Sequence, residues 1–304
     1  MSGRVGVVVM AYGTPASPED IEPYYTHIRR GRAPEPAQLA ELTARYEALG
    51  GTSPLAARTE AQRSAIADAL ESADPGRFTV MLGQKHAAPF IEDAIGALAD
   101  TGVSRIIGLV LAPHFSNASV GEYHARAAES AGERGIDYVG IDDWYALDAH
   151  VEFHARALRA VLTEMPERTK VVFTAHSLPE RVLVDDPYAD QLFEGAGLIA
   201  RAAGLERWAG WGIAWQSAGR TPEPWRGPDI LAVIDDLAET GRAEGIVIVP
   251  HGFTADHLEV LYDVDIEAAA RAADRGLVLK RPPVVNADPT VMAALAARVR
   301  SLAG

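Results

Sequence analysis

The chain has 304 residues, of which 48% are hydrophobic and 23% charged, and its net charge is −14. This length predicts two domains of roughly 150 residues each, which are large enough to fold without a disulfide or a structural metal. Because the chain has no cysteine, disulfides, a cysteine nucleophile and thiolate-bound zinc or iron–sulfur clusters are excluded. The acidic balance argues against a general nucleic-acid or anionic-membrane surface.

The sequence shows neither a membrane span nor a signal peptide. No stretch approaches the ~18 apolar residues of a membrane span. The N-terminal segment, residues 1–11, lacks the basic lead-in and the long apolar region of a signal peptide. The lack of cysteine also fits a reducing compartment. We therefore expect a cytoplasmic protein.

Short apolar runs alternate along the chain with longer amphipathic segments. Several of the runs lack polar alternation, as expected of strands covered on both faces. They predict strands over Val5–Met10, Phe78–Leu82, Ile106–Ala112, Tyr138–Ile141, Val171–Thr174, Trp211–Trp215 and Ile246–Val249. The segments around them predict helices over Pro36–Leu49, Thr59–Glu71, Pro89–Ala99, Tyr123–Ala131, Val151–Leu162, Ala189–Ala203, Asp229–Thr240, Asp256–Ala273 and Pro289–Leu302. This alternation is typical of a parallel, doubly wound α/β sheet.

Two pairs of segments repeat in the same order. "VVVMAYGTP" from Val7 matches "VVFTAHSLP" from Val171, which makes Tyr12 and His176 equivalent. "LVLAPHFS" (109–116) likewise matches "VIVPHGFT" (247–254), and both are strands that end in Pro-His. The repeats indicate two similar α/β lobes, although chance similarity of strand ends is the alternative. We expect the lobes to span 1–147 and 148–304, with the last helix packing back on the first lobe.

Polar side chains stand at the ends of these strands. In doubly wound sheets, ligands bind beyond the carboxyl ends of the strands. Tyr12, His114, His176 and His251 all follow such ends, so we expect them to line a ligand cleft between the lobes. Each of them alone could instead be a satisfied loop residue.

A row of carboxylates lies in "DHLEVLYDVDIE" (256–267). Glu259, Asp263 and Glu267 are four residues apart, which on an α-helix places them on one face. They are either a solvated acidic face or a row that passes a divalent cation or a proton. The mutual repulsion of three aligned carboxylates argues against the first interpretation.

Basic residues gather near the N-terminus, in "THIRRGRAPEP" and the segments that follow. Arg29, Arg30 and Arg32 could simply end a helix, but Arg45 and Lys85 add to the cluster. On an acidic protein this cluster favours an anionic small molecule, a polycarboxylate or a phosphate.

Two further stretches carry weaker signals. The loop "WQSAGRTPEPWRGPD" (215–229) places Trp225 either as a buried anchor or as an aromatic wall for a flat ligand. "GAGLIA" (195–200) fits a dinucleotide fingerprint formally, but it lies inside a predicted helix, so we reject that interpretation.

Taken together, several segments resemble the ferrochelatases, and most closely those of Gram-positive bacteria that act on coproporphyrin. The segments are "AYGTP", "YYTHIRRGR", "RYEALGGTSPL", "GQKHAAPFIEDA", "LAPHFSNASVGEY", "TAHSLPE", "WQSAGRTPEPWRGPD" and "ADHLEVLYDVD". The resemblance runs from near Val7 to the final helix. It implies two Rossmann-like lobes with a porphyrin cleft between them. It also implies insertion of ferrous iron into coproporphyrin III, with release of two protons and no organic cofactor. Protoporphyrin IX as substrate, a cobalt or nickel chelatase and a non-catalytic tetrapyrrole-binding protein are the alternatives.

The resemblance also implies roles for single residues. His176 and Glu259 match the family's metal-binding pair, and His176 matches its proton acceptor as well. Tyr12 matches the residue that reaches the porphyrin metal from the opposite face. The positions that hold the porphyrin and its carboxylates are matched by Arg29, Arg45, Tyr46, Ser53 and Tyr123.

Asp263 and Glu267 match an acidic row near a secondary site for a hydrated divalent cation, for which we expect Mg²⁺. The chain departs from many family members by lacking the cysteines of an iron–sulfur cluster. It also has His251 where an apolar residue is expected, either as a polar group near the metal route or as a loop variant. We expect a monomer that transiently contacts the next haem-pathway enzyme.

Overall fold

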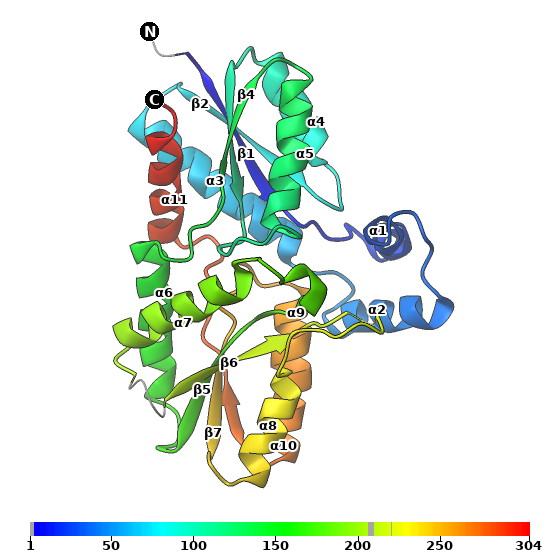
Figure 1. Ribbon diagram of the computed structural model, residues 1–304, viewed down its shortest axis with the longest axis vertical. Coiled ribbons are helices and arrows are strands. Elements are labelled where there is room, and N and C mark those ends of the chain that lie inside the picture. The colour runs from blue at the N-terminus through cyan, green and yellow to red at the C-terminus, as the bar shows by residue number, and fades with distance from the viewer. Residues whose placement is uncertain (1–2, 206–209, 220) are drawn as a thin grey trace. The chain divides into compact units, whose positions relative to one another are not determined.

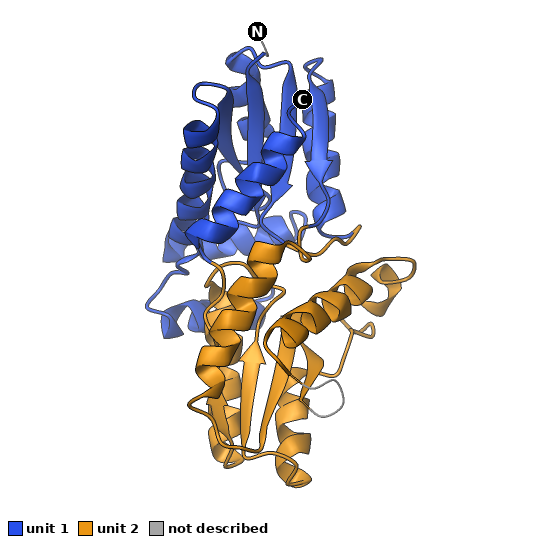
Figure 2. Ribbon diagram, turned by 90° about the vertical axis from the view of Figure 1, so that its left-hand side faces the viewer, with its two compact units in different colours: residues 1–112, 118–143, 286–304 blue, residues 113–117, 144–285 orange. Residues whose placement is uncertain are grey.

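The computed structural model describes residues 3–205, 210–219 and 221–304, and these form two compact units (Figure 2). Unit 1 comprises residues 1–112, 118–143 and 286–304, and unit 2 comprises 113–117 and 144–285. The predicted division at 147/148 differs from these bounds in two respects. Residues 113–117 and 144–147 belong with unit 2, and residues 286–304 belong with unit 1, on which the last helix was expected to pack.

Unit 1 is built on a parallel four-stranded sheet with the order β2-β1-β3-β4. Its strands are β1 (Val5–Ala11), β2 (Phe78–Gln84), β3 (Arg105–Val110) and β4 (Asp137–Ile141). Its helices are α1 (Ile21–Ile28), α2 (Pro36–Ala48), α3 (Leu55–Ala73), α4 (Ile91–Asp100), α5 (Val120–Gly132) and α11 (Pro289–Ser301), with a 3₁₀ turn at Pro18–Asp20. Within the unit, α4 and α5 pack together, and α11 packs against α3 (Figure 1).

Unit 2 repeats this plan with a parallel sheet of order β6-β5-β7-β8. Its strands are β5 (Thr169–His176), β6 (Trp211–Gln216), β7 (Gly245–Val249) and β8 (Val278–Lys280). Its helices are α6 (Asp148–Leu162), α7 (Tyr188–Ala202), α8 (Ile230–Glu239), α9 (Leu258–Val260), a π-helix (Leu261–Ala268) and α10 (Ala269–Asp274), with a 3₁₀ turn at Glu180–Val182.

The two sheets have the same strand order, so the fold-class prediction of two similar parallel α/β lobes is confirmed. Both repeated sequence pairs fall on equivalent strands: β1 corresponds to β5, and β3 corresponds to β7. These are the central strands on either side of the point where the strand order reverses, which is where ligands bind in such sheets. The predicted cleft between the lobes concerns their relative placement and stays a prediction.

The sheet of unit 2 is covered on both faces by apolar side chains. On one face, α6 and α7 pack on alternate residues of β5 and β7 around Phe173 and Val247. On the other face, α8, the π-helix and α10 pack around Val172 and Ile248. Two-sided burial explains why these strands read as apolar runs without alternation. Among the described residues, no helix is both long and apolar enough to cross a membrane.

Three predicted features differ from the structure. Helix α1 was not predicted, since Pro23 and its polar neighbours gave it no clear apolar periodicity. Strand β8 was not predicted because it is a three-residue edge strand. The predicted single helix Asp256–Ala273 is wrong: this segment is α9, then a π-helix, then α10. A π-helix turn holds an extra residue, so spacing by four no longer fixes one face.

Candidate functional site

The end of β5 presents His176 to a carboxylate from the start of α9. Nε2 of His176 lies 3.5 Å from Oε1 of Glu259, and each of the two side chains is about one third exposed, at 35% and 34%. The pair therefore consists of a half-buried base and a half-buried carboxylate that both remain accessible from one side. Sequence reasoning named both residues, and the structure brings them together.

Backbone and tyrosine contacts fix the orientation of His176. Its Nδ1–H donates to the carbonyl oxygen of Ser177, and Tyr188 Oη donates to the carbonyl oxygen of His176 at 3.1 Å. With Nδ1 engaged in this way, Nε2 of the neutral ring is left to accept a proton or bind a metal.

The two groups shift each other's pKa in opposite directions. Burial alone would lower the pKa of His176, but the Glu259 carboxylate and the Ser177 carbonyl outweigh it and raise this pKa to about 9. Burial would raise the pKa of Glu259, but His176 and then His257 hold it well below its usual range. At neutral pH the metal-free pair is thus imidazolium and carboxylate.

Two further residues hold Glu259, and sequence reasoning did not select either of them. Nε2 of His257 lies 3.6 Å from Oε2 of Glu259, and its Nδ1–H donates to the Ala255 carbonyl at 2.8 Å. Buried Gln216 donates from Nε2 to the Glu259 carbonyl at 2.7 Å. Both stand in segments that the sequence singled out, "ADHLEVLYDVD" and "WQSAGRTPEPWRGPD". The signal that could have found His257 is its proximity to Glu259 in the sequence. For Gln216 the signal is its position at the end of a predicted strand.

The carboxylate row does not form the uniform face that α-helical spacing predicts. Asp263 is buried and accepts a hydrogen bond from Ser217, whose backbone is left-handed (φ 60°). Glu267 is exposed, and Asp265 pairs instead with Arg281 at 2.7 Å. Asp263 and Glu267, which were predicted to lie on one face, therefore differ in burial, because the turn of the π-helix is wider than that of an α-helix. Their role as a cation or proton path stays a prediction.

In unit 1, Tyr12 directly follows β1 and is 43% exposed. Its ring lies 4.6 Å from that of His86, centroid to centroid, and Nδ1 of His86 lies 3.0 Å from Nδ1 of His27. Burial, then Lys85 and His27, lower the pKa of His86 to about 3, so the ring is neutral. Sequence reasoning missed both histidines, although each stood in a segment that carried the resemblance.

The predicted porphyrin-binding residues all lie in unit 1 and fall into two groups. Tyr46, Ser53 and Tyr123 are at least nine-tenths buried. Tyr46 Oη lies 3.4 Å from Thr14 Oγ1, Ser53 Oγ accepts from the Leu55 amide, and burial raises the pKa of Tyr123 well above its usual value.

The basic members of the set stand on α1 and α2. Arg29 caps α1, donates from Nε to the Arg32 carbonyl and lies over the ring of Tyr25. Arg45, on α2, lies 3.7 Å from Glu41. Lys85 is buried and pairs with Glu122 at 2.5 Å, so its charge is already compensated.

The Gly- and Pro-rich loop between β6 and α8 is anchored but not buried. Trp225 is half-buried, donates from Nε1 to Thr221 Oγ1 at 2.9 Å and bridges to Pro179. Residue 220 of this loop lies outside the described residues. The exposure of Trp225 does not fit a buried anchor and keeps the aromatic-wall interpretation open.

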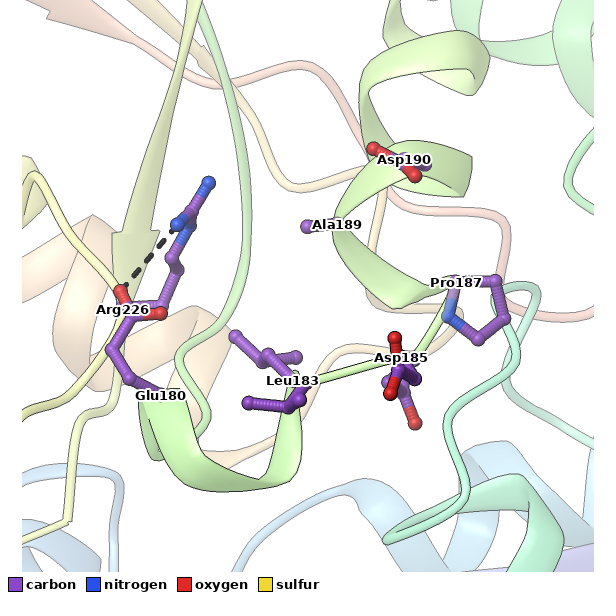
Figure 3. A pocket seen from close by; sticks show the side chains of 9 residues that line it. Glu180, Leu183, Asp185, Pro187, Ala189, Asp190 and Arg226 are labelled. Atoms are coloured by element: carbon purple, nitrogen blue, oxygen red, sulfur yellow. Dashed lines mark hydrogen bonds and ion pairs between the residues drawn. The ribbon is translucent and has the colours of Figure 1, made fainter.

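A cavity of about 620 Å³ lies elsewhere in unit 2 (Figure 3). Its walls carry the Glu180–Arg226 ion pair and several aspartates, and neither His176 nor Glu259 lines it. Its volume is therefore no guide to the His176–Glu259 chemistry. Within residues 3–205, 210–219 and 221–304, no three His, Asp or Glu side chains are already arranged as a metal cage.

Known proteins resemble this chain over nearly its full length. A family model described as Ferrochelatase matches residues 4–303. Coproporphyrin III ferrochelatase of Bacillus subtilis (strain 168) is 45% identical over 300 residues, covering 96% of each chain. Coproporphyrin III ferrochelatase of Oceanobacillus iheyensis is 44% identical over 299 residues, covering 96% of this chain and 95% of that protein.

Two solved structures share the fold. SirB from Bacillus subtilis with Fe³⁺ has a TM-score of 0.61 at 14% identity, covering 99% of this chain and 96% of that one. CbiX, the terminal enzyme of siroheme biosynthesis in denitrifying bacteria, has a TM-score of 0.51 at 13% identity, covering 98% and 99%. At these identities the likeness extends to architecture alone.

Proposed function

Because the chain belongs to the ferrochelatase family, we propose that it inserts Fe²⁺ into coproporphyrin III to give Fe-coproporphyrin III in haem biosynthesis. The relatives that carry this name align with nearly the whole chain. The observation that carries the proposal is the His176–Glu259 pair, a partly exposed imidazole and carboxylate 3.5 Å apart at the end of a central strand.

The His176–Glu259 pair is suited to bind iron that must later be released to the porphyrin. Neutral imidazole and carboxylate are good ligands for ferrous iron, and thiolate is not required. A closed cage of four protein ligands would hold the metal too firmly for transfer. Two side chains give a site of moderate affinity from which iron passes to the macrocycle.

Proton movement follows from the raised pKa of His176. With a pKa of about 9, the imidazole carries a proton at neutral pH until an incoming cation displaces it. Once iron moves to the ring, the vacated imidazole beside Glu259 regains its affinity for protons and accepts one from a pyrrole nitrogen. Two protons leave the macrocycle for each iron, so His176 must pass the first one on. Buried Asp263 and exposed Glu267 are the carboxylates that we assign to this path, and Mg²⁺ binding near Glu267 belongs to the same proposal.

Unit 1 supplies the residues for the porphyrin. The exposed Tyr12 phenol is assigned to the axial position on the product iron, with Arg29 and Arg45 assigned to propionates. The buried Tyr46, Ser53 and Tyr123 shape the wall behind them. Binding of the carboxylates supplies the free energy that holds the macrocycle in a bent form, in which a pyrrole lone pair faces the metal.

One assay separates the proposal from its rivals. The purified protein is mixed anaerobically with Fe²⁺ and either coproporphyrin III or protoporphyrin IX, and metal insertion is followed by absorbance. We expect faster insertion into coproporphyrin III. Preference for protoporphyrin IX, or for Co²⁺ or Ni²⁺ over Fe²⁺, would move the assignment to another chelatase. Tight binding without insertion would identify a carrier.

Sedimentation in the same buffer tests the proposed monomer. Sedimentation after addition of the next haem-pathway enzyme tests the proposed transient contact.

A further inference from the structure

Unit 2 contains a cluster of four histidines that the proposed chemistry does not use. We call it the histidine cluster: His114, His150, His154 and His251, each at most 2% exposed. His114 lies in the 113–117 segment, His150 and His154 lie one turn apart on α6, and His251 follows β7. The sequence placed His114 and His251 at strand ends facing a ligand, but both side chains are instead buried in unit 2.

The rings contact one another and a wall of aromatic side chains. The ring centroids of His150 and His154 are 4.7 Å apart, and those of His114 and His251 are 5.2 Å apart, both pairs edge to face. The aromatic side chains packed on the cluster are Trp144, Tyr145, Phe153, Phe173 and Tyr188.

The cluster is almost without hydrogen-bond partners. Both ring nitrogens of His114, His150 and His154, and Nδ1 of His251, have none among the described residues. Nε2 of His251 lies 3.1 Å from the Leu192 carbonyl. Buried polar atoms usually find partners, so this number of unsatisfied nitrogens in one place is unusual.

In the part of the chain that the structure describes, no carboxylate is paired with a ring of the cluster. The charged groups that act on His114, His150 and His154 are other members of the cluster. On the surrounding elements, Tyr145 Oη donates to Glu194, and Asp186 accepts from Ser116 and from the Asn117 amide. The remaining charged residues of α6 and α7 are exposed: Asp148, Glu152, Arg156, Arg159, Asp190, Glu194 and Arg201.

Two contacts connect the cluster to the strand that carries His176. The ring of His114 meets that of Tyr188 edge to face at 6.4 Å, and Tyr188 Oη donates to the His176 carbonyl. His251 packs on Phe173 of β5, and the amide of Gly252 donates to the Thr174 carbonyl at 3.1 Å. The cluster thus supports the last residues of β5 from behind, without touching His176 itself.

We propose that the histidine cluster is a proton-sensitive switch that keeps the end of β5 and Tyr188 in place while all four imidazoles are neutral, and releases them in acid. Because no ring nitrogen of one cluster histidine is hydrogen-bonded to another among the described residues, a single added proton already places a cation in a buried cluster without a counter-ion, which only local opening relieves.

The direction of the pH effect follows from the burial of the rings. Burial lowers the pKa of all four histidines below the ordinary value of 6.5, to about 4 for His251. The opened state therefore binds protons more tightly than the closed one. Stability of the closed form is complete above pH 6.5 and is lost as pH falls from there toward about 4. A metal is the other occupant that histidines suggest, but the described residues hold no group arranged to bind one.

Hydrogen exchange of the full-length protein tests the switch without relying on catalysis. Exchange of peptides covering residues 171–178 is measured between pH 7.5 and 4.5, corrected for intrinsic rates. We expect reversible loss of protection below pH 6.5, before unit 1 opens. In the double variant H150F/H154L the midpoint should move to lower pH by about one unit.

Single variants and a control guard against misfolding and general acid effects. H251V serves if the double variant does not fold, and it should shift the midpoint in the same direction. H124Q removes a half-buried histidine of unit 1 and should leave the midpoint of residues 171–178 unchanged. Equal midpoints in wild type and cluster variants would overturn the proposal. So would a rise in Tm with Zn²⁺ that the variants abolish, because the cluster would then be a metal site.

Discussion

Nε2 of His257 faces Oε2 of Glu259 at 3.6 Å, while the other carboxylate oxygen, Oε1, faces His176. One carboxylate therefore stands between two imidazoles that belong to different segments of unit 2. In the mechanism that we propose, His257 is the partner that remains beside the Glu259 carboxylate when His176 gives up its proton to bind iron. An isolated carboxylate in this half-buried place would instead take up a proton itself.

Replacing His257 with Gln should weaken iron capture more than it slows transfer. Second partners of a metal ligand typically change metal affinity by about 10- to 100-fold. We expect KM for Fe²⁺ to rise within this range, with a smaller fall in kcat. Initial rates at varied Fe²⁺ under anaerobic conditions measure both parameters. An unchanged KM would show that the contact is only structural.

Replacing His176 with Ala should abolish metal insertion and leave porphyrin binding intact. The imidazole is the only proposed group that both holds iron and accepts the pyrrole proton. Absorbance assays follow insertion, and fluorescence titration with free-base coproporphyrin III follows binding. H124Q, outside the proposed site, is the control and should retain activity. Turnover near the wild-type level in H176A would refute the assignment.

The pH dependence of iron binding should change when Glu259 loses its charge. Iron must displace the His176 proton, so apparent affinity in wild type should increase as pH rises toward about 9. In E259Q the carboxylate that raises the pKa of His176 is gone, so this slope should flatten above pH 7 while the affinity itself falls. The exposed Glu239 offers the matched control, E239Q, which should behave as wild type.

The same pair predicts the sign of a stability effect. The pKa of His176 is above its unfolded value and that of Glu259 is below it, so the pair's contribution is complete between pH 4.5 and 6.5, declines in acid as Glu259 is protonated and is lost as pH rises through about 9. Urea midpoints of wild type and E259Q should therefore converge on the alkaline side of this window. A constant difference up to pH 10 would contradict the coupling.

Replacing Tyr12 with Phe should alter the product complex more than the chemical step. The phenol oxygen is proposed as an axial ligand, and its ring packing on His86 would survive the change. We expect a shifted absorption spectrum of bound Fe-coproporphyrin III and faster product release. An identical spectrum would argue against ligation by Tyr12.

Replacing Leu295 with Ala should destabilise unit 1 by about 2–5 kcal/mol, because this α11 side chain is fully buried. R298A alters an exposed residue on the same helix and should cost less than about 0.5 kcal/mol. Chemical denaturation followed by circular dichroism compares the two. A small effect of L295A would mean that α11 contributes little to the core of unit 1.

Much of the fold was predictable because the central strands are covered on both faces. Buried strands such as Val5–Met10 and Ile246–Val249 have no polar alternation, and helix starts at Asp229 and Asp288 are marked by side chains that accept from backbone amides. The repeat between β1 and β5 correctly anticipated equivalent strands. The edge strand β8 has too few residues to carry a pattern.

Less of the candidate site than of the fold could be predicted from the sequence. Residue types and order indicated His176 and Glu259, but no apolar periodicity in this segment revealed the π-helix, whose turns hold one residue more than those of an α-helix. The burial of His114 and His251 was equally impossible to predict from the sequence. Burial of an imidazole depends on which aromatic side chains surround it, and for these two histidines they come from the segment before α6, from α7 and from β5.

Helix α11 packs against α3, although 215 residues of chain separate the end of one from the start of the other. During synthesis the ribosome delivers all of unit 2 before it delivers the helix that completes unit 1. Domains usually fold in the order in which they emerge. Here unit 1 is completed after unit 2, so nascent chains carry an exposed α3 face until α11 has been translated. Chaperones that bind apolar helix faces would bind this protein at α3. Mutations in α11 that weaken its packing would prolong that binding.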